Sequence, residues 1–122
     1  MVYYSLTGNV RRFVEKTGRP ARSLPDSRTL AEPFVLVTPT TGFGDVPTTV
    51  AEYLRKYGVL LRGVAASGNR NWGANFGRAG DIICEQYCVP LIVKFELAGN
   101  ENEVQFFNDY LKMSPATISR VI

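Results

Sequence analysis

Four short, mostly apolar runs alternate along the chain with four segments whose apolar residues recur at helical spacing. The runs cover residues 1–4, 34–37, 59–66 and 90–97, and they are enriched in Val and Tyr. Runs of this length are typical of strands buried on both faces of a parallel sheet. Because parallel strands need crossover helices, which then cover both faces, the alternation predicts an α/β doubly wound sheet.

The helical segments each present one repeating stripe. The repeating positions are Val10, Phe13, Val14 and Thr17; Val50, Tyr53, Leu54 and Tyr57; Phe76, Ala79, Ile83 and Tyr87; and Val104, Phe107 and Leu111. Each stripe can pack one helix onto a sheet. Pro47 suits the first turn of the second helix, and Asn100 with Glu103 is similar to a capping box at the start of the last one.

The second strand is the hardest element to place. Residues 17–33 are rich in Pro, Arg and Ser, and only residues 21–24 offer a weak strand candidate. A chain of 122 residues suits one domain, because two hydrophobic cores would need a longer chain. We expect that domain to cover residues 1–113, followed by a C-terminal tail at 114–122.

The chain contains no histidine, the side chain best suited to general acid–base catalysis near neutral pH and the commonest metal ligand. We therefore expect no catalytic side chain and no metal site, and any chemistry should come from a borrowed cofactor. The net charge is +3 and the basic residues are scattered, so a nucleic-acid-binding surface is not indicated.

The search for targeting signals and the number of cysteines say little more about the function. No apolar run approaches the roughly 20 residues that a membrane span needs, and no signal peptide is evident, so we expect a cytoplasmic protein. Cys84 and Cys88 are the only cysteines, too few for the disulfide framework of a small secreted domain. We interpret them as two small core residues, with a redox pair as the alternative.

Ligands of a doubly wound sheet bind beyond the carboxyl ends of its strands, so the loops after the strands carry the first site candidates. The loop 5–9 lies between the first strand and the first helix, where free N–H groups and the helix dipole favour a phosphate. It has no Lys, so a monophosphate suits it better than a triphosphate. Its Ser, Thr and Asn could equally serve only as helix caps.

Two later loops place aromatic residues among glycines. In the loop 38–45, two glycines flank Phe43, a pattern that lets the backbone turn beside a planar ligand. The loop 67–76 holds Trp72, which we interpret as stacking on a flat ring, with a hydrophobic plug as the alternative. The joint placement of these loops after the first, third and fourth strands indicates a cofactor site.

The first loop resembles the phosphate loop of the flavodoxin-like superfold, which has the form Ser/Thr-x-Thr-Gly-Asn and is Ser5-Leu6-Thr7-Gly8-Asn9 here. The segments 40–44, 66–73 and 94–97 narrow the resemblance to the NrdI family, the FMN proteins that accompany class Ib ribonucleotide reductases. The resemblance spans residues 3–111. It implies a five-stranded parallel sheet in the order 2-1-3-4-5 with helices on both faces.

The resemblance also implies FMN as the cofactor and a set of residues that bind it. These are Ser5, Leu6, Thr7, Gly8, Asn9 and Val10 at the phosphate; Thr40, Thr41, Gly42, Phe43 and Gly44 along the flavin ring; and Ser67, Gly68, Asn69, Asn71, Trp72 and Gly73 on its other side. Gly44 would lie near flavin N5, and Trp72 would flank the ring. Arg70 could supply positive charge to the flavin or be a solvated loop residue.

The implied activity is electron transfer from reduced FMN to O2. The superoxide or peroxide would oxidise the dimanganese centre of the reductase small subunit and so assemble its tyrosyl radical cofactor. The protein would be an activating partner that takes electrons from an unidentified reductase. A general flavodoxin electron carrier is the alternative, although carriers of that family are strongly acidic and this chain has a net charge of +3. A response-regulator-like module is disfavoured, because the acidic residues it needs at strand ends are missing.

Overall fold

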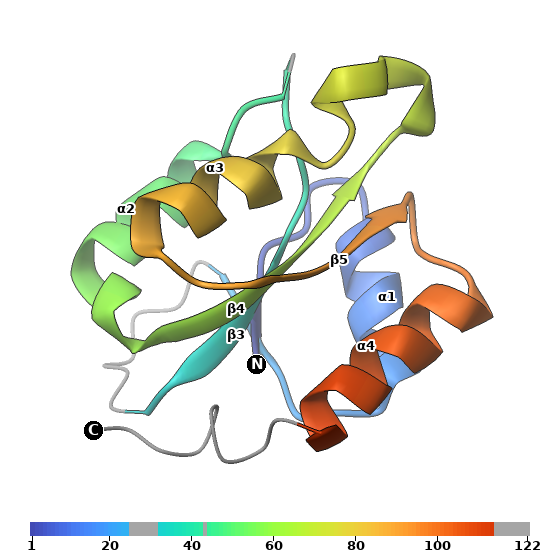
Figure 1. The fold of residues 1–122 in the computed structure, drawn as a ribbon, viewed down its shortest axis with the longest axis horizontal. Coiled ribbons are helices and arrows are strands. Elements are labelled where there is room, and N and C mark those ends of the chain that lie inside the picture. Colours follow the sequence, from blue (N-terminus) through green and yellow to red (C-terminus); the bar gives the residue numbers. More distant parts are fainter. Residues whose placement is uncertain (25–31, 43, 114–122) are drawn as a thin grey trace.

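The computed structural model describes residues 1–24, 32–42 and 44–113, and in it five parallel strands form one sheet in the order β2-β1-β3-β4-β5 (Figure 1). The strands are β1 (Val2–Tyr3), β2 (Arg22–Ser23), β3 (Phe34–Thr38), β4 (Leu61–Gly68) and β5 (Leu91–Glu96). The helices are α1 (Asn9–Thr17), α2 (Thr48–Tyr57), α3 (Arg78–Tyr87) and α4 (Glu101–Met113). The predicted doubly wound sheet and its strand order are confirmed.

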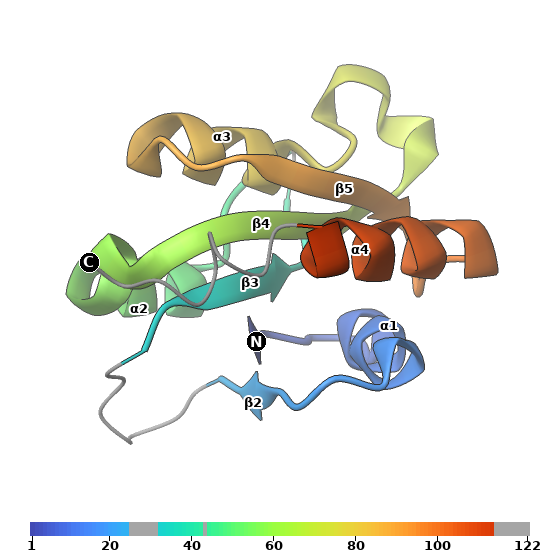
Figure 2. The same cartoon turned by 60° about the horizontal axis from the view of Figure 1, so that its bottom comes forward.

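Two helices cover each face of the sheet (Figure 2). Helices α1 and α4 pack against Val35 and Val37 of β3, whereas α2 and α3 pack on the side of Phe34 and Leu36. This alternation follows from the period of two residues in a strand. Because both faces of β3 are covered, every residue of that strand is buried, which explains its continuous apolar run.

Three phenylalanine rings join α1, β5 and α4. The ring of Phe13 in α1 stacks on that of Phe95 in β5, with centroids 3.8 Å apart and planes 8° apart. The ring of Phe107 in α4 meets Phe13 edge to face at 5.4 Å. After β5, the chain passes so close to this cluster that a Cβ on Gly99 would lie 2.5 Å from Phe13 Cδ1. The start of α1 and the turn after β5 are therefore fixed relative to each other.

Several element boundaries differ from the sequence prediction, and three of the differences follow from local structure. The run 59–66 begins in a 3-10 turn, η1 (Gly58–Leu60), so β4 starts two residues later than expected and extends to Gly68. Phe76 lies outside α3, because Gly77 adopts a left-handed φ of 61° and the helix begins only after it. Pro47 immediately precedes α2 instead of lying in its first turn.

Other local predictions are confirmed. The weak strand candidate at 21–24 contains β2, which pairs in parallel with β1. At the start of α4, the Glu103 N–H donates to Asn100 Oδ1 at 2.8 Å and the Asn100 N–H donates to Glu103 Oε1 at 2.9 Å, which is the predicted capping box. The tail expected at 114–122 lies outside the described residues.

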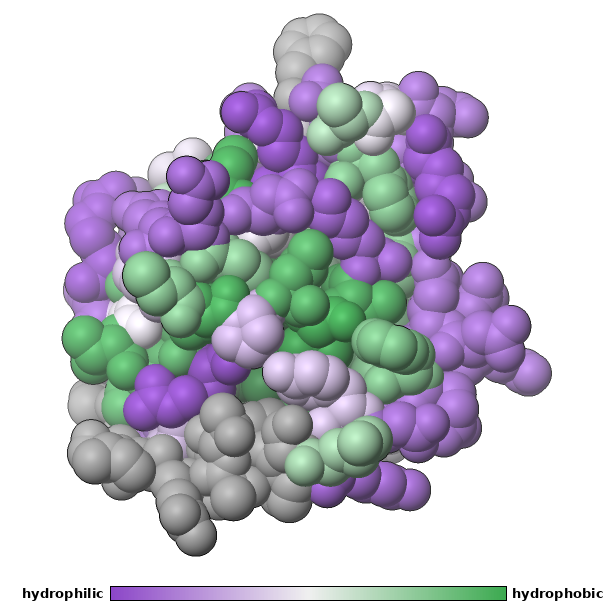
Figure 3. All heavy atoms as spheres, viewed as in Figure 1, coloured by the Kyte–Doolittle hydropathy of each residue, from purple (hydrophilic) through white to green (hydrophobic). Residues whose placement is uncertain are grey.

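Strand β5 forms one edge of the sheet, and hydrophobic residues gather over it between α3 and α4 (Figure 3). Lys94 lies within β5, and its Nζ lies 2.7 Å from Oδ2 of Asp81 on α3. A charge in the middle of an edge strand discourages pairing with another chain. Among the described residues, no helix is long and apolar enough to cross a membrane.

Replacing Phe107 with Ala should lower the free energy of unfolding by about 3–5 kcal/mol, because it removes a fully buried ring from the three-phenylalanine cluster. The neighbouring Phe106 is 56% exposed and gives a matched control on the same helix, for which the Ala variant should change stability by less than about 0.5 kcal/mol. Urea denaturation of both variants measures the difference. Equal losses in the two variants would show that the cluster does not carry this stability.

Candidate cofactor-binding site

The loops that follow β1, β3 and β4, together with the turn after β5, enclose a cavity of about 220 Å³. Nine of its lining residues belong to the set predicted from the sequence: Leu6, Thr7, Asn9, Val10, Thr40, Ser67, Gly68, Asn69 and Trp72. The cavity is smaller than the roughly 300–1,000 Å³ of typical ligand pockets. A larger ligand seated there would therefore extend beyond it.

The other predicted residues do not line this cavity. They are Ser5, Gly8, Thr41, Gly42, Gly44, Asn71 and Gly73. Phe43 lies outside the described residues. Most of these residues instead shape the loops, as their hydrogen bonds and backbone angles show.

In the first loop, Ser5 has a capping role. Its Oγ accepts hydrogen bonds from the N–H groups of Gly8 at 3.1 Å and Arg11 at 3.3 Å. The helix-cap alternative is thus right for this one residue. Within the described part of the chain, the N–H groups of Thr7, Asn9 and Val10 have no recorded acceptor. Free N–H groups at the positive end of α1 are suited to an anion.

Thr40 places a hydroxyl in the cavity wall with no hydrogen-bond partner among the described residues. Its Oγ1 is buried, and the whole residue is only 7% exposed. A buried hydroxyl without a partner costs free energy, so such groups are uncommon and call for an explanation. A ligand with a polar group at this point would supply the missing partner.

The second loop is a tight turn. The N–H of Thr41 donates to the carbonyl of Asp45 at 2.9 Å, and the N–H of Asp45 donates back at 2.7 Å. Gly42 and Gly44 have φ values of 54° and 108°, which other residues rarely adopt. A Cβ on Gly44 would also lie 2.8 Å from Cδ of Arg78, so α3 holds this turn from behind.

The third loop presents Trp72 to the cavity. The loop forms the 3-10 segment η2 (Arg70–Asn75), in which Asn69 Oδ1 accepts from the Asn71 N–H at 2.9 Å and the Asn69 carbonyl accepts from the Trp72 N–H at 3.0 Å. Trp72 is 42% exposed, so it does not fold back as the hydrophobic plug that was the alternative. Its ring is available to a planar ligand.

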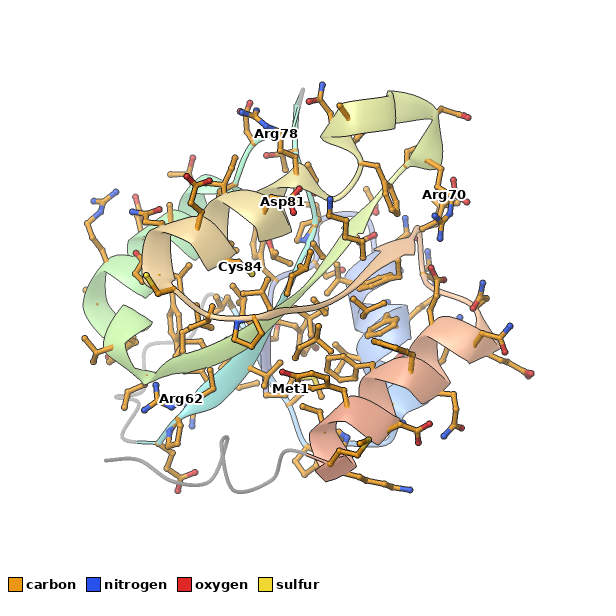
Figure 4. The ribbon with its side chains drawn as sticks, in the orientation of Figure 1. Met1, Arg62, Arg70, Arg78, Asp81 and Cys84 are labelled. Carbon is orange, nitrogen blue, oxygen red and sulfur yellow. The ribbon has the colours of Figure 1, made fainter. Side chains whose placement is uncertain are left out.

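Arg70 is exposed, as expected for a solvated loop residue, and it also forms ion pairs that sequence reasoning did not predict. It lies at the end of β5 beside the start of α4, where its Nη2 is 3.0 Å from Glu103 Oε2 and its Nε is 3.6 Å from Glu96 Oε1 (Figure 4). The guanidinium also lies over the ring of Phe76, 4.8 Å from its centroid. Two carboxylates offset its charge, so Arg70 fixes the third loop and brings little net charge to the cavity.

Sequence reasoning missed Pro39 and Leu97, which also line the cavity. Leu97 has a left-handed φ of 55°, unusual for a residue with a side chain, and its carbonyl accepts a hydrogen bond from Ser67 Oγ at 2.7 Å. Strained backbone of this kind often occurs at ligand sites. The rule that ligands bind beyond the carboxyl ends of strands, here called the strand-end rule, could have found Leu97, because Leu97 directly follows β5.

The two cysteines differ from the interpretation of a buried pair. Cys84 is half-buried against the α2–α3 side of the core, but Cys88 is exposed at the end of α3. Burial, with a smaller contribution from Asp81, raises the pKa of the Cys84 thiol to about 11. The thiolate is scarce there at neutral pH, which disfavours a redox pair.

A sequence profile described as NrdI Flavodoxin like matches residues 1–109. Protein NrdI of Macrococcus caseolyticus is 51% identical over 109 residues, which cover 88% of this chain and 84% of that protein. Protein NrdI of Bacillus licheniformis is 52% identical over 108 residues, or 88% of this chain and 82% of that protein.

Solved structures show the same fold. A short-chain flavodoxin associated with a bacterial microcompartment superposes with a TM-score of 0.76 at 20% identity, covering 97% of this chain and 96% of that one. The flavodoxin of Streptococcus pneumonia TIGR4 gives a TM-score of 0.65 at 19% identity, covering 96% and 97%. At these identities the likeness concerns the fold alone.

Thr40→Val should raise the free energy of unfolding of the ligand-free protein by about 1 kcal/mol, because it removes a buried hydroxyl without a partner. Thr38→Val is the matched control, since Thr38 is equally buried but its Oγ1 donates to the Pro39 carbonyl at 2.9 Å. That variant should lose about 1 kcal/mol. Thermal or urea unfolding separates the two, and a shift in the same direction would contradict an unpaired Thr40 hydroxyl.

Proposed function

The chain belongs to the NrdI flavodoxin-like family, which implies a flavin cofactor, and we propose that this cofactor is FMN, bound where the three loops meet. The observation that carries the proposal is the Thr40 hydroxyl, which has no hydrogen-bond partner among the described residues and is buried in the wall of the cavity that Trp72 and the start of α1 also line. The chain thus brings together an aromatic face, a buried polar group and a helix start suited to an anion. A flavin bearing a phosphate has a planar ring, polar ring atoms and an anionic group to match these three features.

The phosphate would be held at the start of α1. The N–H groups of Thr7, Asn9 and Val10, which have no recorded acceptor in the described part of the chain, can donate to its oxygens. Trp72 would flank the ring on one side, and the turn that holds Gly44 would lie near flavin N5. The cavity would cover only part of the ligand, so one edge of the ring would stay accessible to O2.

We further propose that the protein activates the small subunit of a class Ib ribonucleotide reductase. When bound, FMN supplies the redox chemistry, in which electrons from a separate reductase pass to O2 and the superoxide or peroxide oxidises the subunit's dimanganese centre to assemble its tyrosyl radical cofactor. The chain's own residues bind and orient the ring and limit the access of water. No described side chain in the cavity is required as an acid or a base.

Exposed apolar residues around the cavity support the proposal that this protein binds a protein partner there. Leu6, Trp72 and Leu97 line the cavity and are 57%, 42% and 51% exposed. Exposed apolar residues that adjoin a functional site are typical of surfaces that bind other proteins. The net charge of +3 also differs from the acidic character of electron-carrier flavodoxins, and a basic protein tolerates an anionic oxygen product better than an acidic one does.

The proposal is tested by an absorbance spectrum of the purified protein with FMN, followed by anaerobic reduction and admission of air. We expect a bound yellow flavin that reoxidises quickly, releases superoxide or peroxide, and activates the manganese-loaded reductase subunit when that subunit is present. Slow reoxidation without activation would favour a general electron carrier. Absence of flavin binding would reject both functions.

Trp72→Ala should weaken FMN binding by about 1–3 kcal/mol through loss of stacking. Its stability should change little, because the ring is 42% exposed. A fluorescence titration with FMN and a thermal unfolding curve measure the two effects separately. Phe106→Ala removes an aromatic ring exposed elsewhere on the surface and should leave the affinity unchanged. A folded Trp72→Ala variant with normal affinity would contradict the stacking role.

A further inference from the structure

Arg12 folds back from α1 over the first loop. Its Nη2 donates to Asn9 Oδ1 at 2.6 Å, one helical turn earlier. A Cβ placed on Gly8 would lie 3.0 Å from Arg12 Nη1 and 3.7 Å from Arg12 Cζ, so the guanidinium lies directly against the loop backbone. The side chain is exposed to solvent, yet it is held beside the loop instead of extending away from it.

The charge of Arg12 has no carboxylate partner among the described residues. Arg12 thus differs from Arg70, which pairs with Glu96 and Glu103, and from Lys94, which pairs with Asp81. One of the five N–H donors of Arg12 is used by Asn9, and the others have no recorded acceptor in the described part of the chain. A guanidinium that is held in place and keeps free donors is well suited to bind an oxyanion.

A second, independent observation marks the same cavity as a ligand site. Asn9, which holds Arg12, lines the cavity together with Thr40, whose buried Oγ1 has no partner among the described residues. The N–H groups of Asn9 and Val10 are also without a recorded acceptor there. Arg12 does not itself line the cavity, but its hydrogen bond to Asn9 places the guanidinium beside the helix start, which shares that cavity with the buried hydroxyl.

We propose that Arg12 recognises the phosphate group of the flavin and makes the site selective for FMN over riboflavin, an inference that rests on the proposed function. Asn9 holds the Arg12 guanidinium in position before the ligand arrives. The free N–H groups of the guanidinium then donate to the phosphate oxygens. Glycine suits position 8 for two reasons. Its φ of 91° is strained for other residues, and a Cβ there would lie 3.0 Å from Arg12 Nη1 and crowd the guanidinium.

The test compares the affinities of the wild-type protein and its variants for FMN and for riboflavin by flavin fluorescence titration. Arg12→Gln should weaken FMN binding by about 10- to 100-fold, as expected for a lost hydrogen bond between charged groups, and should change riboflavin binding by less than about twofold. Arg12→Lys keeps the charge but loses the planar guanidinium with its paired N–H donors, so its FMN affinity should be intermediate.

Arg55→Gln is the matched control, because Arg55 is an exposed arginine on α2 and its loss changes the net charge equally. Its FMN affinity should equal that of the wild type. FMN binding to Arg12→Gln should also depend less on salt concentration than wild-type binding, since a phosphate contact has been removed. Thermal unfolding checks that each variant is folded.

Equal effects of Arg12→Gln on FMN and riboflavin, or no effect on either, would overturn the inference and leave Arg12 as a residue that only shapes the loop. These results would leave the proposed function standing, because wild-type FMN binding is measured in the same experiment. Wild-type protein that binds neither flavin would overturn the proposed function and the Arg12 inference together.

Discussion

The geometry of the site depends on the stacking of Phe13 on Phe95, which Phe107 supports by an edge-to-face contact with Phe13. This stacking fixes α1 to β5, and therefore fixes the first loop to the turn that carries Leu97. Lys16 strengthens the same junction, because its Nζ lies 3.3 Å and 2.9 Å from the carbonyl oxygens of Ala98 and Gly99. Two segments more than 80 residues apart in sequence thus form adjacent walls of one cavity.

The remaining walls are held by contacts within the chain. The turn at 41–45 is closed by its own backbone hydrogen bonds, and Arg70 ties the third loop to Glu96 and Glu103. Thr40 Oγ1 is buried in the wall of the same cavity and has no recorded partner among the described residues. The left-handed backbone of Leu97 is a further local cost. Because the chain's own contacts hold the loops, little ordering is needed when a ligand binds.

Much of this arrangement could be predicted from the sequence, because it depends on local patterns. Alternating runs and stripes predicted the sheet and its helices, and the strand-end rule brought three separate loops to one cavity. The failures have specific physical reasons. The helical stripe that includes Phe76 continues past the true start of α3, since a periodic pattern does not reveal the left-handed turn at Gly77. The pairing of Arg70 could not be predicted, because Glu96 and Glu103 become its neighbours only after β5 and α4 are in place.

The position of Trp72 has an optical consequence. It is the only tryptophan in the chain, and its half-exposed ring lines the cavity. All indole emission from the protein therefore originates at the mouth of the site, undiluted by signals from the core. The colour and lifetime of that emission report directly on whether the cavity is occupied by water, a planar molecule or a docked surface. The protein thus contains a built-in sensor of occupancy that needs no label.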